Sequence, residues 1–151
     1  MSLKKGDPVP HFTLKDQEGK DFDISDLAGK KPFVIYFYPK DHTPGCTAEA
    51  CSFRDSYEDF KDLGAEVIGI SSDSGSSHQK FASKHRLPFI LLSDPDQKVS
   101  RLFGVKNYLF GFIPGRETYV FDRNGKVLLV FNSLKAASHI EKALSVLKAS
   151  A

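Results

Sequence analysis

Nearly continuous apolar runs alternate with stretches of helical periodicity along this chain. Residues 33–38 and 66–71 are rich in β-branched and aromatic side chains, which is typical of strands buried on both faces of a sheet. Between them, apolar residues recur at alternating spacings of four and three from Cys46 to Phe60, as on one face of a helix. We therefore expect a strand, a helix that stops near Gly64, and a second strand.

The alternation continues through the second half of the chain. An amphipathic helix is expected over residues 76–85, ending before Pro88, because a residue that precedes proline avoids the helical region. The loop that we expect later carries Tyr108, Phe110 and Phe112. After the helix at residues 76–85 we expect a strand (89–92), a helix (96–103), a glycine-punctuated loop (104–115) and, after the hairpin at residues 118–131 described below, a final helix (136–148).

Two β-hairpins are expected, one near each end of the chain. Residues 118–122 and 126–131 flank an Asn-Gly turn signal, and a second hairpin is expected from residues 12–14 to 22–24. A strand-helix-strand-helix block followed by a hairpin and a helix is the thioredoxin-like α/β plan. We expect a largely parallel sheet that becomes antiparallel at one end, helices on both faces, and the N-terminal hairpin as an extension.

Length and composition suit one domain over residues 1–151. The chain has 151 residues, 40% of them hydrophobic, which is enough for one core. Its 21 basic and 19 acidic side chains give a net charge of +2 without a dense Lys/Arg run, so no nucleic-acid partner is expected. The sequence shows neither a signal peptide nor a bilayer-spanning stretch. We expect no membrane partner and a cytoplasmic location, or a plastid location if a transit peptide has been removed.

The loop after the first buried strand delivers a cysteine to the start of a helix. Thr43 can serve as the N-cap, Pro44 suits the first helical position, and Cys46 then falls at the third position. A helix N-terminus offers partial positive charge and unpaired N–H groups, which favour a thiolate over a thiol. This placement points to a reactive cysteine.

The two cysteines of the chain are predicted to face different ways. Cys46 lies on the apolar stripe, whereas Cys51 belongs to an acidic stripe with Asp55, Glu58 and Asp62. Residues five apart in a helix have Cα atoms roughly 8–9 Å apart, whereas a disulfide needs them within about 7 Å. A disulfide between Cys46 and Cys51 would therefore require the first turns of the helix to unwind.

Residues 43–55, with the sequence TPGCTAEACSFRD, closely resemble the atypical two-cysteine peroxiredoxins of the bacterioferritin-comigratory, or peroxiredoxin Q, type. The resemblance covers nearly the whole chain. Its other motifs are FTL at 12–14, FYP at 37–39, VIGIS at 67–71, LLSD at 91–94 and PGRETYV at 114–120.

This resemblance implies roles for five residues. Cys46 matches the peroxidatic cysteine, Cys51 the resolving cysteine, Thr43 and Arg116 the active-site threonine and arginine, and Pro39 the loop proline that shields the site. The implied activity is reduction of hydrogen peroxide and organic hydroperoxides through a sulfenic acid and an intramolecular disulfide, recycled by thioredoxin or a similar dithiol reductant. The resemblance implies no cofactor, and it favours a monomer.

Each of these residues also has an ordinary structural interpretation. Cys46 could be a small buried core residue, and Cys51 an inert surface thiol. Thr43 could cap the helix and do nothing else, and Arg116 could be a solvated arginine at the start of a strand. Sequence separation alone does not place Arg116 beside Cys46, so that assignment depends on the resemblance.

Other polar residues near the loop are interpreted as structural. Glu49 and Tyr38 could tune or shape the pocket, but such residues are more often a helix-surface charge and a sheet aromatic, so neither is assigned a catalytic role. We expect no metal site, because the cysteines and histidines lack the spacing of metal ligands. The histidines expected to be solvated or partly packed are His42, His78, His85 and His139.

Two other functions compete with a peroxidase. A thioredoxin-like thiol–disulfide exchanger would usually carry Cys-x-x-Cys, which this chain lacks. A redox sensor would use the oxidation of Cys51 and helix unwinding to expose a binding surface. Peroxide turnover separates the enzyme from both alternatives.

Overall fold

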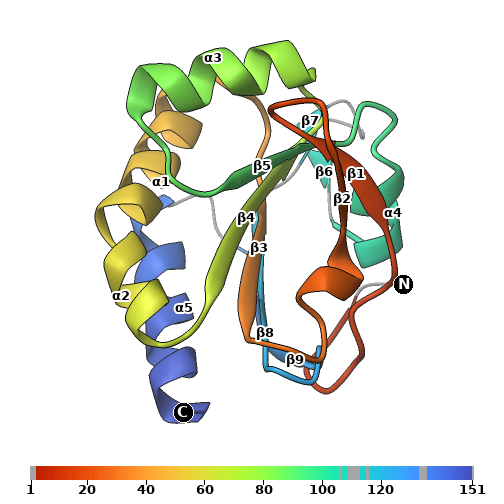
Figure 1. The fold of residues 1–151 in the computed structure, drawn as a ribbon, viewed down its shortest axis with the longest axis vertical. Coiled ribbons are helices and arrows are strands. Elements are labelled where there is room, and N and C mark those ends of the chain that lie inside the picture. Colours follow the sequence, from red (N-terminus) through yellow and green to blue (C-terminus); the bar gives the residue numbers. More distant parts are fainter. Residues whose placement is uncertain (1–2, 106, 109–112, 115, 133–135, 151) are drawn as a thin grey trace.

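The computed structural model describes residues 3–150 apart from 106, 109–112, 115 and 133–135. Seven strands form one sheet in the order β2-β1-β5-β4-β3-β8-β9, and β6 pairs with β7 separately (Figure 1). The strands are β1 (Thr13–Asp16), β2 (Asp21–Asp23), β3 (Phe33–Phe37), β4 (Glu66–Ser71), β5 (Ile90–Ser93), β6 (Asn107–Tyr108), β7 (Ile113–Pro114), β8 (Glu117–Phe121) and β9 (Val127–Asn132). The helices are the 3-10 helix η1 (Ile24–Asp26) and α1 (Pro44–Asp55), α2 (Tyr57–Asp62), α3 (Gly75–His85), α4 (Lys98–Phe103) and α5 (Ala136–Ser150). Within the described ranges, no helix has the length and apolar character that a membrane crossing requires.

The main sheet is mixed, with a parallel centre. Among the described strands, β3, β4 and β5 run parallel to one another, whereas β1 joins β5, and β8 joins β3, in antiparallel pairs. The expected mixed sheet flanked by helices is confirmed, and the two hairpins add its antiparallel strands at the edges. The N-terminal extension is confirmed, since β1 and β2 pair antiparallel and extend the sheet beyond β5.

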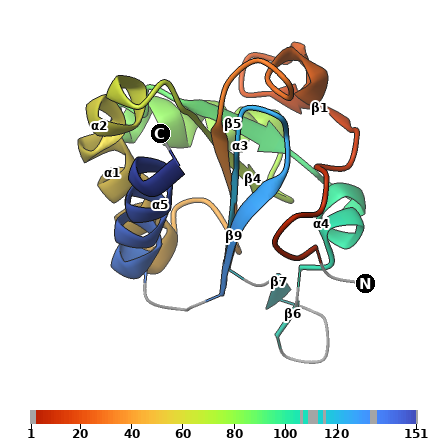
Figure 2. The ribbon, with the colours of Figure 1, turned by 90° about the horizontal axis from the view of Figure 1, so that it is seen from below.

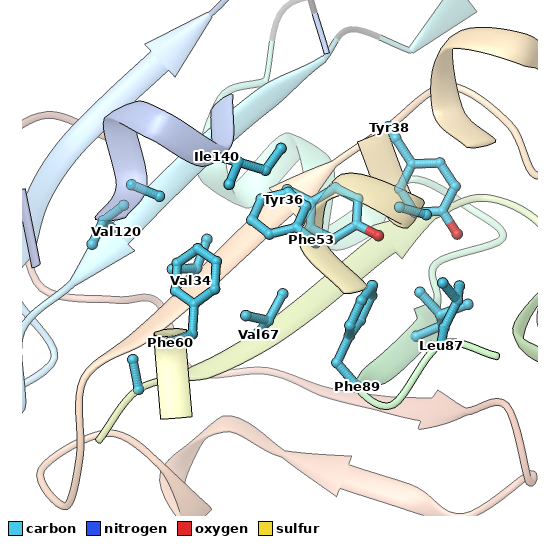
Figure 3. Close-up of a cluster of buried hydrophobic side chains, with 14 of the residues drawn as sticks. Val34, Tyr36, Tyr38, Phe53, Phe60, Val67, Leu87, Phe89, Val120 and Ile140 are labelled. Atoms are coloured by element: carbon cyan, nitrogen blue, oxygen red, sulfur yellow. The ribbon is translucent and has the colours of Figure 1, made fainter. Parts of the chain in front are cut away.

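Alternate residues of β3 build two cores on opposite faces of the sheet. Val34 and Tyr36 belong to one core and Phe33 and Ile35 to the other, and every residue of β3 is buried. Helices α1, α2, α3 and α5 contribute to the first core, and α4, η1 and the N-terminal segment to the second (Figures 1 and 2). In the first core the ring of Tyr36 stacks on Phe53 of α1 at 4.5 Å between centroids (Figure 3).

The helix predicted after β3 is divided in two. The stripe from Cys46 to Phe60 is buried as expected, apart from the half-buried Tyr57. The backbone of Ser56 leaves the helical region at φ −101° and ψ 5°, which separates α1 from α2. The apolar pattern continues across this break because both helices pack on the same core.

The end of α3 has a different cause from the one predicted. Arg86 adopts a left-handed conformation at φ 52° and donates its N–H to the carbonyl of Ala82. A left-handed residue is a common helix C-cap, so Arg86 ends α3 two residues before Pro88.

The segment from Gly104 to residue 115 is more regular than the expected loop. It contains the antiparallel pair β6 and β7, with Tyr108 opposite Ile113. The expected aromatic positions Phe110 and Phe112 lie outside the described residues. The following hairpin is confirmed, since β8 and β9 pair antiparallel and Gly125 in their turn has a φ of +78°.

Candidate active site

Cys46 lies in the first turn of α1, as the sequence predicts. Thr43 is the N-cap residue with extended backbone angles, and Pro44 is the first helical residue. The side chain of Cys46 is a free thiol, 2% exposed, at the edge of the first core. A helix N-terminus that presents a buried sulfur can stabilise negative charge on it.

Pairing between β3 and β8 brings Arg116 to this sulfur. The antiparallel register places Phe37 opposite Glu117, so Arg116, one residue earlier, lies where β3 runs into the loop before Cys46. Its Nη2 donates to the Cys46 Sγ at 3.4 Å, and the side chain is buried. The alternative of a solvated arginine is therefore wrong.

Glu49 is the partner of Arg116, a contact that sequence reasoning missed. Arg116 Nη1 donates to Glu49 Oε1 at 2.5 Å, and the glutamate is fully buried. Burial raises the pKa of Glu49 to about 7, while the charge of Arg116 and its hydrogen bond act in the opposite direction. The surface-charge interpretation of Glu49 is thus wrong. Its spacing of three residues from Cys46 was the available signal, because residues three apart share a helix face.

The second carboxylate oxygen of Glu49 points toward the C-terminal helix. Glu49 Oε2 lies 3.6 Å from Nδ1 of His139 on α5, and that nitrogen lies 2.6 Å from the hydroxyl oxygen of Thr118. All three residues are fully buried. The sulfur and guanidinium are therefore backed by a polar chain that reaches across β8 to α5.

The side chain of Thr43 is bound to the loop before α1 and not to the helix itself. Thr43 occupies the N-cap position, but within the described structure its side chain does not accept the capping hydrogen bond. Its hydroxyl donates instead to the Lys40 carbonyl at 2.7 Å. The capping-only interpretation is wrong, and the hydroxyl oxygen keeps lone pairs that can accept a hydrogen bond.

Cys51 and Pro39, the two other residues that the resemblance singles out, are both partly buried. Cys51 is a partly buried free thiol inside the continuous helix α1, so this conformation is the wound form, without a Cys46–Cys51 bond. Pro39 is partly buried between β3 and α1. Its shielding role stays a prediction.

Gly45 and Tyr36 also belong to the site, and the sequence did not single them out. A Cβ at position 45 would lie 3.0 Å from Arg116 Nη2, so glycine leaves room for the guanidinium. The hydroxyl of Tyr36 is buried and has no hydrogen-bond partner among the described residues. Burial and then the charges of Glu49 and Cys46 raise its pKa well above 10, which keeps the phenol neutral.

His78 and His139 are more deeply packed than predicted, because both are fully buried. Tyr38 is buried, as expected for its strand, and its hydroxyl donates to Asp41. Tyr38 is therefore part of a polar network as well as a sheet aromatic. His42 is exposed and His85 partly exposed, as expected.

A family model described as the AhpC/TSA family matches residues 5–130. The chain belongs to this family. A chloroplastic peroxiredoxin Q of Sedum lineare is 56% identical over 147 residues, covering 97% of this chain and 78% of the relative. The crystal structure of peroxidoxin BcpB from Mycobacterium tuberculosis superposes with a TM-score of 0.91 at 42% identity, covering 97% of both chains. A mutant of Xanthomonas campestris peroxiredoxin Q gives 0.85 at 35% identity, covering 93% of this chain and 92% of the other.

Family membership confirms the resemblance seen in the sequence. The chain is a peroxiredoxin of the Q type with a thioredoxin-like fold, and hence a thiol-dependent peroxidase with a peroxide substrate and a thioredoxin-type reductant. A peroxiredoxin Q from Arabidopsis thaliana, 54% identical over 148 residues, is also named as chloroplastic. Such names support the plastid alternative, and the cytoplasmic location stays a prediction.

Proposed function

We propose that Cys46 is the nucleophile of this peroxidase. Its thiolate attacks one oxygen of the peroxide, the O–O bond breaks, and the other oxygen leaves with the bonding electron pair. That oxygen takes up a proton to become water or an alcohol, and the sulfur becomes a sulfenic acid. The observation that carries this proposal is the contact of 3.4 Å between the Cys46 sulfur and the buried guanidinium of Arg116.

In this proposal Arg116 serves both the sulfur and the substrate. A fixed cation beside the sulfur stabilises the thiolate and the charge that moves onto the leaving oxygen. Its Nε is buried and has no hydrogen-bond partner among the described residues, so one donor remains for a peroxide oxygen. The Thr43 oxygen is proposed to accept a hydrogen bond from the peroxide, and Pro39 to limit water at the site.

Cys51 is proposed to resolve the sulfenic acid. Its thiolate attacks the Cys46 sulfur, the hydroxyl leaves as water after taking a proton, and a disulfide forms. Because both cysteines lie in the wound helix α1, this step requires local unwinding. A thioredoxin-type dithiol then reduces the disulfide and restores both thiols.

The substrate is proposed to include organic hydroperoxides as well as hydrogen peroxide. One similar structure, at 34% identity and a TM-score of 0.84, is described by the alkyl peroxide reduction activity of a Xanthomonas campestris bacterioferritin comigratory protein. We also propose that the protein acts as a single-domain monomer without nucleic-acid or membrane partners, which light scattering and binding assays would test.

The decisive experiment compares peroxide consumption by wild type, Cys46→Ser and Cys51→Ser with a thioredoxin recycling system. We expect Cys46→Ser to abolish turnover. Cys51→Ser should still form a sulfenic acid on the first peroxide and recycle poorly. Rapid disulfide reduction without peroxide turnover in the wild type would favour the exchanger instead.

A further inference from the structure

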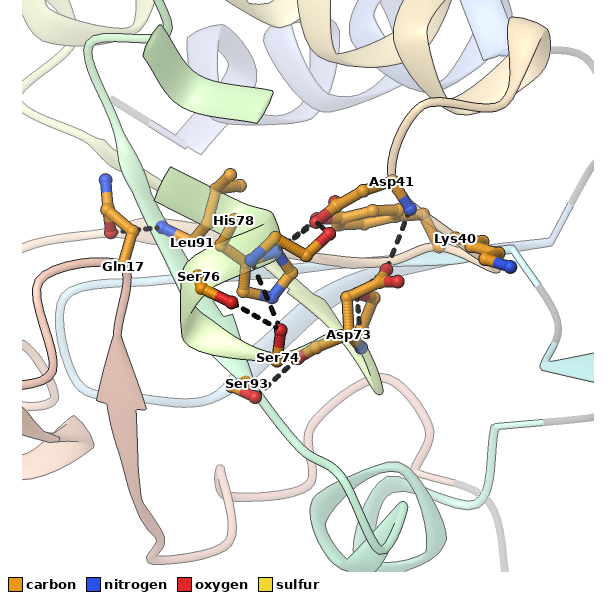
Figure 4. A network of polar contacts seen from close by, with 12 residues as sticks. Gln17, Lys40, Asp41, Asp73, Ser74, Ser76, His78, Leu91 and Ser93 are labelled. Atoms are coloured by element: carbon orange, nitrogen blue, oxygen red, sulfur yellow. Dashed lines mark hydrogen bonds and ion pairs between the residues drawn. The ribbon is translucent and has the colours of Figure 1, made fainter. Parts of the chain in front are cut away.

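A buried polar network holds the loop between β3 and α1, away from the sulfur itself (Figure 4). Two residues lie at the centre of this network. Asp41 is five residues before Cys46 and 2% exposed, and His78 is fully buried in α3. The two side chains connect the reactive loop to a helix that carries none of the proposed catalytic residues.

Asp41 is held by both its side chain and its main chain. Its Oδ1 accepts from the Tyr38 hydroxyl at 2.6 Å, and its Oδ2 accepts from the Ser77 hydroxyl at 2.9 Å and lies 2.7 Å from His78 Nδ1. The Asp41 N–H donates to Asp73 Oδ2 at 2.7 Å. The loop is therefore tied to α3 and to the segment that precedes it.

The partners of His78 determine where its protons are. Nε2 lies 3.0 Å from the carbonyl oxygen of Leu92, which can only accept, so Nε2 carries a proton. Nδ1 lies 2.7 Å from the Asp41 carboxylate, and the Tyr38 proton is already donated to the other carboxylate oxygen. Both ring nitrogens are therefore engaged, Nδ1 with the Asp41 carboxylate and Nε2 with the Leu92 carbonyl.

The same contacts account for this cluster without a metal ion. Ligand atoms of Asp41, Asp73 and His78 lie within 4.8 Å of one another. A histidine binds a metal through an unprotonated ring nitrogen, and both nitrogens of His78 face acceptors. The cluster is organised as a tether.

The tethered loop has a conformation that needs support. His42, next to Asp41, has a φ of 65°, a left-handed conformation that is unfavourable for a non-glycine residue. The Thr43 carbonyl then accepts the first helical hydrogen bond from Thr47 at 2.8 Å. Asp41 thus fixes the loop immediately before the turn that must open for a disulfide to form.

We propose that the contact between Asp41 and His78 is a latch that keeps the start of α1 wound and so limits how fast Cys51 reaches oxidised Cys46. In this role both are positioning residues, and the inference rests on the proposed roles of the two cysteines. Loosening the latch favours unwinding. Resolution becomes faster, while the reaction with peroxide, which uses the wound form, gains nothing.

The test compares His78→Gln with His85→Gln, a matched change on the same helix that leaves Asp41 untouched. Reduced protein is mixed with hydrogen peroxide, and sulfenic acid formation and disulfide formation are followed separately in a single turnover. Removing a hydrogen bond to the Asp41 carboxylate loosens the loop, so we expect disulfide formation about tenfold faster in His78→Gln, sulfenic acid formation no faster, and His85→Gln like wild type. Amide exchange in residues 45–50 should accelerate by a similar factor.

His85→Gln controls for a general loosening of α3, so an acceleration in His78→Gln alone is diagnostic. Disulfide formation that is unchanged or slower in His78→Gln overturns the latch. If His78→Gln does not fold, Ser77→Ala removes one hydrogen bond to Asp41 and should accelerate the same step by a smaller factor; no acceleration there overturns the proposal too. A wild type that forms no Cys46 sulfenic acid would instead overturn the proposed function.

Discussion

Glu49 and Arg116 lie 67 positions apart in the chain and form a buried ion pair beside the sulfur of Cys46. One guanidinium nitrogen contacts the glutamate, and another contacts the sulfur at 3.4 Å. The glutamate therefore fixes the orientation of the guanidinium beside the Cys46 sulfur. Removing one partner of such a pair leaves the other charge buried and uncompensated, which is usually more costly than losing both.

Glu49→Gln should slow the first reaction with peroxide. Glutamine can still accept a hydrogen bond from Arg116, but it no longer balances the guanidinium charge or holds it as firmly. A loss of about 1.4–3 kcal/mol in this contact corresponds to roughly 10–100-fold in the rate of sulfenic acid formation. Single-turnover kinetics would measure it, with Glu58→Gln, an exposed glutamate of α2, as the matched control. Equal rates in the two variants would show that the charge of Glu49 is not needed.

Glu49 should also make stability depend on pH. Burial raises its pKa from 4.5 to about 7, although Arg116 opposes the shift. The folded state therefore binds this proton more tightly than the unfolded chain does. The contribution is complete below pH 4.5 and is lost as the pH rises through about 7.

Urea unfolding of wild type and Glu49→Gln across this pH window would measure the effect. The free energy of unfolding of wild type should fall relative to the variant as the pH rises, by at most about 3 kcal/mol. A difference between the two proteins that stays constant from pH 4.5 to about 7 would mean that Glu49 is ionised throughout.

Local sequence signals predicted the position of Cys46, and long-range pairing determined what surrounds it. Thr43 and Pro44 mark the helix start within a few residues, so the third helical position follows from the sequence. Arg116 reaches the site through the register that sets Phe37 opposite Glu117. The hairpin of β8 and β9 was predictable from its turn, but nothing local shows that β8 also pairs with β3.

Two polar residues, Glu49 and His78, are more deeply buried than the sequence indicated. Glu49 and His78 each look like surface residues of a helix, because their partners, Arg116 and Asp41, lie 67 and 37 positions away. Glu49 lies three residues after Cys46 on the same side of α1, and this spacing was a signal for a role at the site. For His78, the sequence offers no comparable signal.

Arg116→Lys should keep the fold but lose most of the activity. A guanidinium can contact Glu49 and the Cys46 sulfur through two different nitrogens, whereas a single ammonium is a point charge without this planar fork. We expect sulfenic acid formation to slow by roughly 10–100-fold, the equivalent of about 1.4–3 kcal/mol. Arg123→Lys, an exposed change in the turn between β8 and β9, is the control. A rate within twofold of wild type would show that positive charge alone suffices.

Tyr36→Phe should stabilise the protein, although it removes a polar group next to the site. The Tyr36 hydroxyl is buried and has no hydrogen-bond partner among the described residues, and an unsatisfied buried group costs about 1–3 kcal/mol. Phenylalanine keeps the ring that stacks on Phe53 at 4.5 Å, so we expect the free energy of unfolding to rise by about 1 kcal/mol. Tyr119→Phe is the matched comparison, because that buried hydroxyl donates to Glu117 at 2.6 Å, and its loss should lower stability by a similar amount. If Tyr36→Phe is instead destabilised like Tyr119→Phe, the Tyr36 hydroxyl has a partner in solution. Buried water is then the candidate, because no peroxide is present during unfolding, and a parallel fall in sulfenic acid formation would show that the hydroxyl also serves the reaction.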